Sequence, residues 1–158
     1  MLGQDANGNL VTGVGPVVGE AIAVHPDVDM VSFTGSTSVG ARIMEAGAAT
    51  MKRQLLELGG KGAGLVMEDA DIAKAVAGIQ SVWAFHSGQI CTAPTRAIVH
   101  RSRYDELVAA LPTVAPNLKV GDPTSMDTLV GPVISSIQRD RIESYIKAGA
   151  DEGAEGGG

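Results

Sequence analysis

The sequence predicts an α/β protein whose parallel sheets carry helices on their faces. Short β-branched runs alternate with longer apolar stripes at helical spacing, as β-α-β units require. Glycine supplies 21 of the 158 residues, and many of these glycines stand between one run and the next. Only five residues are aromatic: one Trp, two Tyr and two Phe. This profile fits an α/β chain with tight glycine turns.

The first sixty residues show the alternation clearly. Three short strands are predicted, at Leu10-Val11, Asp29–Phe33 and Gln54–Glu57. Two helices are predicted, over Pro16–Val24 and from Ser36 to about Ala49. Pro16 suits the first turn of a helix, where its missing N–H costs nothing. Ser36 suits an N-cap, because its hydroxyl can accept from a free backbone N–H.

The second part of the chain repeats the pattern after a group of glycines. Strands are predicted at Leu65-Val66-Met67 and Arg96–His100, and Ser87–Pro94 is predicted to be a loop. Three helices are predicted: one capped by Asp69 or Asp71, one over Tyr104–Leu111 and one over Ile134–Lys147. In the first of these, Ile72, Val76, Ile79 and Trp83 form a single apolar stripe.

The glycine group at 59–64 is the best candidate for a domain boundary. We therefore expect one unit over residues 1–58 and a second over 59–150. Residues 151–158 are of low complexity, and we expect a flexible tail there.

Composition and charge exclude several classes of protein. A net charge of −6 and a pI near 4.9 argue against a surface for nucleic acid or anionic membrane. No apolar run is long enough to span a bilayer, and the N-terminus lacks the pattern of a secretory signal. The single cysteine, Cys91, excludes an internal disulfide and a multi-thiolate zinc site, and no metal site is expected. A reducing cytoplasm is the expected compartment.

Two glycine turns open helices and are candidates for phosphate binding. Gly13-x-Gly15-x-x-x-Gly19 is close to the dinucleotide fingerprint but has one residue too many. It also lacks the acidic residue about 20 positions on, so a plain strand-to-helix turn is the alternative. Gly35 and Ser36 are better placed, because free N–H groups and a hydroxyl at a helix start suit a phosphate. A simple N-cap role for Ser36 is compatible with this.

Glu57 and Cys91 are the candidate catalytic residues. Glu57 lies between Leu56 and Leu58, and apolar surroundings would suit a general base near neutral pH. The alternative is an outward-facing strand residue. Cys91 lies in a small-residue loop, where it is either a nucleophile or a buried spectator. His86 lies five residues away, and could pair with the thiolate or be a solvated residue near a helix end.

Three motifs together closely resemble the NAD(P)-dependent aldehyde dehydrogenase superfamily. They are Phe33-Thr-Gly-Ser-Thr-Ser-Val-Gly40, Leu56-Glu-Leu-Gly-Gly-Lys61, and Gly88-Gln-Ile-Cys-Thr-Ala93 with Arg96. Their order and the spacing between Glu57 and Cys91 match the family. Asp27-Val-Asp29, Asp69-Ala-Asp71 and Gly131-Pro132 also fit. The resemblance runs from about Val11 to Ala150 and covers about the central third of a family member.

The resemblance implies a partial aldehyde dehydrogenase fold with Rossmann-like units. Residues 1–58 would be the C-terminal part of the cofactor-binding domain, and residues 59–150 the N-terminal part of the catalytic domain. The implied reaction oxidises an aldehyde to a carboxylic acid with NAD or NADP. Cys91 would be the nucleophile, with its N–H as half of the oxyanion hole, and Glu57 the base that hydrolyses the thioester. Gly35 and Ser36 would meet the cofactor pyrophosphate and Leu58 the nicotinamide, while Gly15 is a cofactor-binding candidate from its own glycine turn.

The chain also departs from the family pattern. It lacks the family's upstream asparagine of the oxyanion hole and its downstream glutamate for the nicotinamide ribose, and Gly62-Ala-Gly64 replaces the usual Ser-Pro-Asn. Two alternatives therefore stand beside the dehydrogenase. One is a non-catalytic piece that forms oligomers or binds a partner, since missing complementary segments would leave sheet edges open. The other is a cofactor-free thiol esterase that uses Cys91.

Overall fold

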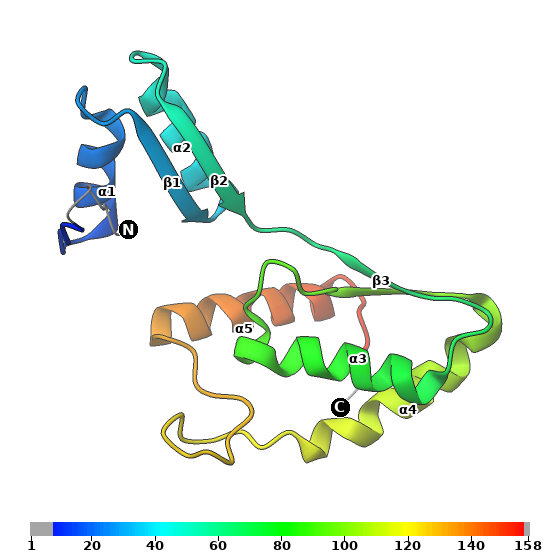
Figure 1. Ribbon diagram of the computed structural model, residues 1–158. Coiled ribbons are helices and arrows are strands. Elements are labelled where there is room, and N and C mark those ends of the chain that lie inside the picture. The colour runs from blue at the N-terminus through cyan, green and yellow to red at the C-terminus, as the bar shows by residue number, and fades with distance from the viewer. Residues whose placement is uncertain (1–7, 157–158) are drawn as a thin grey trace. The chain divides into compact units, whose positions relative to one another are not determined.

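The computed structural model describes residues 8–156, which form two compact units that divide between Gly60 and Lys61. Each unit is an α/β layer with one two-stranded parallel sheet, as the sequence predicts (Figure 1). The expected absence of a secretory signal concerns Met1–Asp5, which lie outside the described residues.

The first unit contains helices α1 (Gly15–Val24) and α2 (Thr37–Ala48) and strands β1 (Met30–Gly35) and β2 (Arg53–Leu58). The strands pair in parallel from Met30↔Arg53 to Gly35↔Leu58, with α2 as the crossover helix. Ala23, Val31 and Ile43 are buried together and join α1, β1 and α2 into one core. Both strands therefore end at the same edge of the sheet, level with each other.

Lys52 links the start of β2 to the chain after α1. Its side chain is buried, with 7% exposed, although lysine is a residue that rarely leaves water. Its Nζ donates hydrogen bonds to the carbonyl of His25, at 2.8 Å, and to that of Val28. These carbonyls belong to the turn that leaves α1, so Lys52 fixes the loop that leads into β1.

The second unit contains strands β3 (Ala63–Val66) and β4 (Arg96–Val99), which also pair in parallel. Its helices are α3 (Ile72–Ala84), α4 (Tyr104–Val114) and α5 (Ser136–Asp151). Short 3₁₀ turns lie at Phe85–Gly88, Arg101–Arg103 and Ala115–Asn117. The core joins β3, α3 and α4 through buried residues: Val66, Ile72, Val76, Ile79 and Leu107.

Most predicted elements are confirmed. The predicted N-cap of α2 is also confirmed, and one of the two candidate caps of α3 is correct. Ser36 caps α2, since its Oγ accepts from the N–H of Val39 at 3.3 Å. Asp71, not Asp69, caps α3 by accepting from the N–H of Lys74 at 3.1 Å.

Several predictions at element level are wrong. Leu10-Val11 is not a strand; both residues are exposed and have no strand beside them among the described residues. Trp83 leaves the core stripe of α3 and is 42% exposed, because its indole N–H donates to the carbonyl of Pro94 at 2.8 Å. Helix α4 continues past Leu111 to Val114 with Pro112 inside, forgoing one backbone hydrogen bond.

The C-terminal helix also differs from its prediction. It extends to Asp151, the first residue of the predicted tail, and Gly153 follows it with a φ of 93° that favours glycine. Residues 157–158 of that tail lie outside the described residues.

Candidate active site

The carboxyl edge of the β1–β2 sheet gathers the predicted cofactor-binding residues of the first unit. Gly35 and Leu58 are the last residues of their strands and are register partners. Gly15 begins α1, and a salt bridge of 2.6 Å joins α1 to α2 between Glu20 and Arg42. Each partner is the sixth residue of its helix, so the two helices start at the same level (Figure 1). Gly15 therefore lies at the same edge as Ser36.

The start of α2 presents hydroxyls and backbone N–H groups without an acceptor among the described residues. Ser36 is exposed, and its Oγ lies 3.1 Å from the Oγ of Ser38. The backbone N–H groups of Thr37 and Ser38 have no acceptor among the described residues. A Cβ at Gly35 would overlap the ring of Phe33, so a larger residue there requires Phe33 to move. Free N–H groups and hydroxyls together suit a phosphate group.

Leu58 and Glu57 face opposite sides of β2. Leu58 packs against Gly40 of α2, where an added Cβ would approach the leucine Cδ2 to 2.8 Å. Glu57 lies on the other face and is exposed. Within the described residues Glu57 thus faces outward instead of into apolar surroundings, and its role as a base stays a prediction. The alternation of β2 placed Glu57 opposite Leu56 and Leu58 but did not show which face α2 covers.

Cys91 lies in the loop between α3 and β4 in the second unit. It is a free, exposed thiol. The N–H of Ala93 donates to the carbonyl of Ile90 at 3.2 Å, so residues 90–93 form a β-turn with Cys91 at its second position. In the described part of the chain, the N–H groups of Ile90, Cys91 and Thr92 have no acceptor. The exposed thiol is therefore flanked in sequence by backbone donors without a partner, and a free N–H group of this kind can bind a negative oxygen.

His86 is not paired with Cys91. Its ring lies edge-on to the ring of Phe85, with the centroids 4.2 Å apart, and no hydrogen bond between His86 and Cys91 occurs in the described structure. The described residues also contain no group of three or more His, Cys, Asp or Glu side chains that could hold a metal ion.

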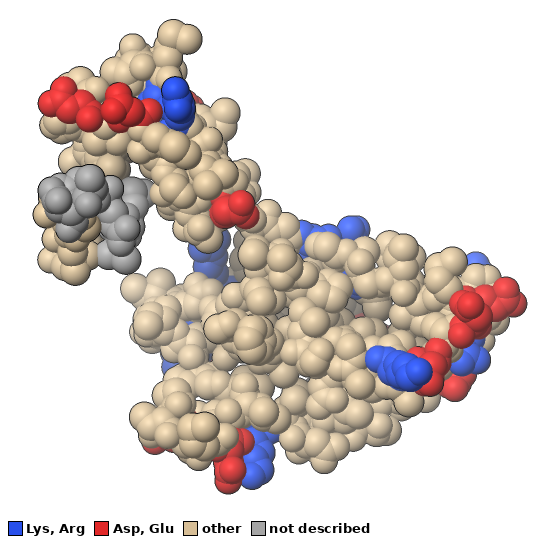
Figure 2. Space-filling view, in the orientation of Figure 1, with Lys and Arg blue, Asp and Glu red and all other residues tan. Residues whose placement is uncertain are grey.

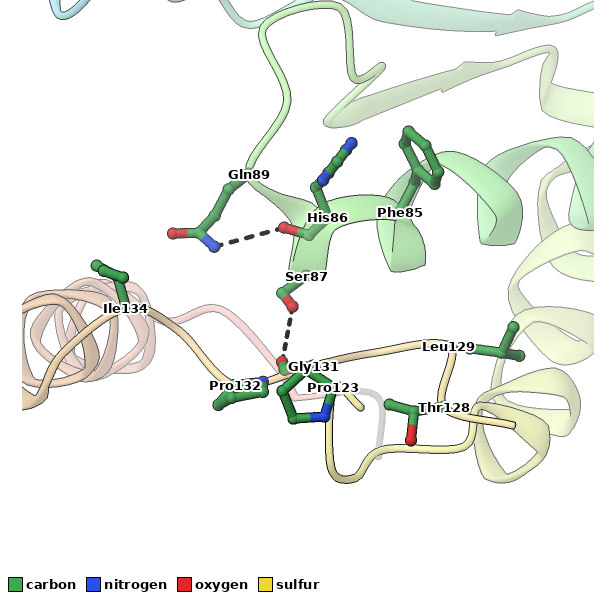
Figure 3. Close-up of a pocket in the computed structure, with 10 residues that line it drawn as sticks. All are labelled: Phe85, His86, Ser87, Gln89, Pro123, Thr128, Leu129, Gly131, Pro132 and Ile134. Carbon is green, nitrogen blue, oxygen red and sulfur yellow. Dashed lines mark hydrogen bonds between the residues drawn. The ribbon is translucent and has the colours of Figure 1, made fainter. Parts of the chain in front are cut away.

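The loop that carries Cys91, residues 85–95 (the thiol loop), is anchored at both ends by hydrogen bonds that the sequence did not predict. Trp83 holds the far end through Pro94, and Ser87 Oγ donates to the carbonyl of Gly131 at 2.7 Å (Figure 3). Ser87 and Gly131 line a surface pocket of about 610 Å³. Neither hydrogen bond could be predicted from the sequence, because the two residues that each one joins are brought together by the folded loop and not by a repeating sequence pattern.

Charged side chains occur in mixed groups on the face shown in Figure 2. Arg42 contacts both Glu20 and Glu45, and these carboxylates, Glu20 foremost, raise the pKa of its guanidinium. Lys119 pairs with Asp127 at 3.4 Å. Within the described residues, no helix combines the length and apolarity needed to cross a membrane.

Residues 7–157 match the model of the aldehyde dehydrogenase family. The chain belongs to this family. It is 46% identical over 149 residues to the aldehyde dehydrogenase [NAD(P)+] 2 of Saccharomyces cerevisiae, covering 91% of this chain and 29% of that enzyme. It is 43% identical over 146 residues to a 3-succinoylsemialdehyde-pyridine dehydrogenase of a Pseudomonas species, covering 92% of this chain and 31% of that enzyme.

Solved aldehyde dehydrogenases have the same fold over the matched part. One from Pseudomonas syringae, complexed with NAD+ and octanal, has a TM-score of 0.87 and 44% identity over 92% of this chain and 30% of its own. An NAD+ complex from Bacillus cereus has a TM-score of 0.87 and 42% identity, with the same coverage. The chain thus spans about 30% of the length of the aldehyde dehydrogenases it matches, and its fold is part of theirs.

Proposed function

We propose that this chain carries the catalytic thiol and the dinucleotide-binding edge of an enzyme that oxidises an aldehyde to a carboxylic acid with NAD or NADP. The observation that carries the proposal is Cys91, an exposed thiol at the second position of a β-turn in which three successive backbone N–H groups have no acceptor among the described residues. Family membership supports the reaction class, and the NAD+ complexes of related enzymes support the cofactor. The two units would serve as parts of the cofactor-binding and catalytic domains, in the cytoplasm.

The residues at the carboxyl edge of β1–β2 fit a dinucleotide. The free N–H groups of Thr37 and Ser38 and the hydroxyl of Ser36 would hold the pyrophosphate, because the N-terminus of a helix favours a negative charge. Gly35 ends β1 directly before Ser36, and Gly15 lies at the same edge with open space where a Cβ would stand. Leu58 would approach the nicotinamide from the end of β2.

The thiol would act first. The Cys91 thiolate forms a C–S bond with the aldehyde carbon, and the carbonyl oxygen becomes an oxyanion that accepts from the N–H of Cys91. When bound, the nicotinamide accepts the hydride that this carbon loses. A thioester then remains on Sγ.

Glu57 would act second, in the hydrolysis of this thioester. Its carboxylate takes a proton from a water molecule, whose oxygen attacks the thioester carbon. The C–S bond breaks, so the acid leaves and the thiolate is restored. An exposed carboxylate suits this step, since the base must reach water.

The test is a chimera in which this chain replaces the matched segment of the yeast NAD(P)+ enzyme. That enzyme supplies the residues that this chain does not contain. We expect absorbance at 340 nm to rise with a short aldehyde and NAD+ or NADP+, and to stay flat in Cys91→Ser. Glu57→Gln should keep a burst of one reduced nucleotide per subunit, while its steady-state rate falls about 10²–10⁴-fold.

Two results would overturn the proposal. One is a folded chimera with no turnover, and the other is turnover that persists in Cys91→Ser. Glu57→Asp is the matched control for the base, because it keeps the carboxylate and should retain part of the steady-state rate.

The thiol esterase is a second candidate, and one observation favours it: Cys91 and its free N–H groups all lie within the second unit. The 158-residue chain without nucleotide would then hydrolyse an activated ester such as p-nitrophenyl acetate. Hydrolysis that survives Cys91→Ser would exclude this function.

A non-catalytic role in self-association is a third candidate, favoured by the uncovered face of the β3–β4 sheet. Leu65 and Ile98 are register partners on that face, and are 66% and 54% exposed. Light scattering of the chain should then show an oligomer, and Leu65→Lys with Ile98→Lys should dissociate it. A monomer in the parent chain would exclude this role.

A further inference from the structure

The thiol loop begins with a backbone turn that folded proteins rarely contain. His86, Ser87 and Gly88 have φ values of 49°, 56° and 75°, so three successive residues are left-handed. Residues other than glycine avoid this region, and they persist there only when the surroundings hold them. Two of the three residues are not glycine, so the turn requires an external support.

Ser87 provides that support. It is half-buried, and its hydroxyl donates to the carbonyl of Gly131 at 2.7 Å across 44 residues of sequence (Figure 3). Another hydrogen bond of the turn is local, since the N–H of Gln89 donates to the carbonyl of His86 at 3.1 Å, only three residues away. An exposed bond of 3.3 Å joins Gln89 to Gln138. The hydroxyl of Ser87 is thus the short, partly buried tie between the turn and the rest of the unit.

The acceptor of this bond is itself fixed. Gly131 follows Val130, which forms a parallel bridge with Val120. The N–H of Gly121 donates to the carbonyl of Val130 at 3.1 Å, and the N–H of Val130 donates to the backbone carbonyl of Lys119 at 3.0 Å. The Gly131 carbonyl therefore belongs to an ordered segment and can serve as an anchor.

Cys91 lies between the two anchors of its loop. Ser87 precedes it by four residues, and Pro94, which accepts from the indole of Trp83 at 2.8 Å, follows it by three. Ala93 beside Pro94 is buried, with 1% exposed. Without the Ser87 bond, the near side of the loop would keep only the exposed 3.3 Å bond between Gln89 and Gln138, and the direction of the Cys91 side chain and N–H would vary.

We propose that Ser87 is a positioning residue for Cys91: its hydrogen bond to Gly131 locks the left-handed turn and so fixes the thiol and its backbone donors. The catalytic consequence rests on the proposed function of Cys91, but the geometric one does not. Misplacing a reacting group by about an ångström costs as much as 10²-fold in rate.

The test uses the fact that Cys91 is the only cysteine. A trifluoromethyl label on its sulfur in the 158-residue chain should give one ¹⁹F signal. In Ser87→Ala we expect several signals or a broad one, with faster hydrogen exchange over residues 89–92. The matched control is Ser81→Ala, which also removes a hydroxyl bond to a glycine carbonyl, at 2.9 Å to Gly78, but outside the turn. It should leave the signal unchanged.

Ser87→Gly separates positioning from strain, because glycine accepts the left-handed turn but has no hydroxyl. It should fold even if Ser87→Ala does not, and it should still give several signals. A single parent-like signal in Ser87→Ala, or in Ser87→Gly, would overturn the proposal.

The chimera distinguishes this proposal from the proposed function. There Ser87→Ala should lower the burst rate about 10- to 100-fold with little change in the KM for NAD+. An inactive chimera with the expected ¹⁹F result would reject the function and keep the positioning role. An unchanged burst rate in an active chimera would reject the positioning role and keep the function.

Discussion

Two candidate site residues, Ser36 and Cys91, lie next to backbone N–H groups that have no acceptor among the described residues. Ser36 satisfies one N–H at the start of α2 and leaves two free, and Cys91 lies among three free N–H groups. Neither residue needs a charged partner to attract an anion. The sequence could place both residues at a turn, because serine before a helix and cysteine after a glycine are local signals. The sequence could not show which neighbouring N–H groups lack an acceptor, because that depends on the hydrogen bonds formed around each residue in the folded chain.

Asp122 offers a prediction about pH at the scale of one residue. Its carboxylate accepts from the hydroxyl of Thr124 at 2.7 Å and from the backbone N–H of Thr124 at 2.8 Å, which together lower its pKa from the ordinary 3.8. Because the folded pKa is the lower one, the stabilisation is present above pH 3.8 and is lost as the pH falls through the folded pKa.

We expect Thr124→Val to move the titration of Asp122 to higher pH, measured by carboxyl ¹³C NMR. The valine keeps the backbone N–H and removes the hydroxyl, the larger of the two causes. Thr113→Val is the control, since its hydroxyl donates to a backbone carbonyl at 2.7 Å and touches no carboxylate. An unchanged midpoint in Thr124→Val would contradict this account of Asp122.

Among the elements, β2 depends on the buried Lys52 at its entrance. We expect Lys52→Met to lower the free energy of unfolding by about 2 kcal/mol, because it leaves the carbonyls of His25 and Val28 without their donor. Methionine keeps the apolar stem. Urea unfolding followed by far-UV circular dichroism measures the change.

The control for this prediction is Lys74→Met, whose side chain is 86% exposed and lies 3.9 Å from Asp71. Such a surface pair contributes little, so the free energy of unfolding should change by less than about 0.5 kcal/mol. Equal effects of the two substitutions would show that the carbonyl contacts of Lys52 do not support β2.

The elements themselves were largely predictable from local signals. Pro16 predicted the start of α1, the hydroxyl of Ser36 that of α2, and the stripe from Ile72 to Ile79 the core face of α3. Errors arose where a distant contact decided the outcome. Trp83 continues the apolar stripe of α3 in sequence, but its indole N–H donates a hydrogen bond to the carbonyl of Pro94. Leu10-Val11 has strand composition, but no strand in residues 8–156 lies beside it to pair with.

At the scale of the whole molecule, the described residues form two units with separate apolar clusters. The candidate site residues are distributed over both units, with Glu57, Leu58 and Ser36 in the first and Cys91 in the second. The order of the motifs could predict membership of the family, which is confirmed. The face of Glu57 could not be predicted, because it depends on which side of β2 receives α2.

The separate clusters predict separate effects on unfolding. Leu107 is 1% exposed, and Leu107→Ala should cost about 2–5 kcal/mol in the second unit. Ile43→Ala should cost a similar amount in the first. The only tryptophan, Trp83, lies in the second unit, so its fluorescence follows that unit.

We therefore expect Leu107→Ala to move the fluorescence transition to lower urea, and Ile43→Ala to move mainly the transition seen by circular dichroism. Equal shifts of the fluorescence transition in both variants would mean that the two clusters unfold as one.

The parallel register of β1 and β2 has a consequence for how this sequence can vary. Gly35 and Leu58 are partners, and Leu58 and Glu57 face opposite sides of their strand. Inserting or deleting one residue within β2 would exchange these two sides, moving the carboxylate against Gly40 and the leucine into water. Substitutions along β2 change one contact at a time, whereas a single-codon insertion or deletion would remove both roles together. We therefore expect the number of residues in β2 to be more strongly constrained than the identity of its individual side chains.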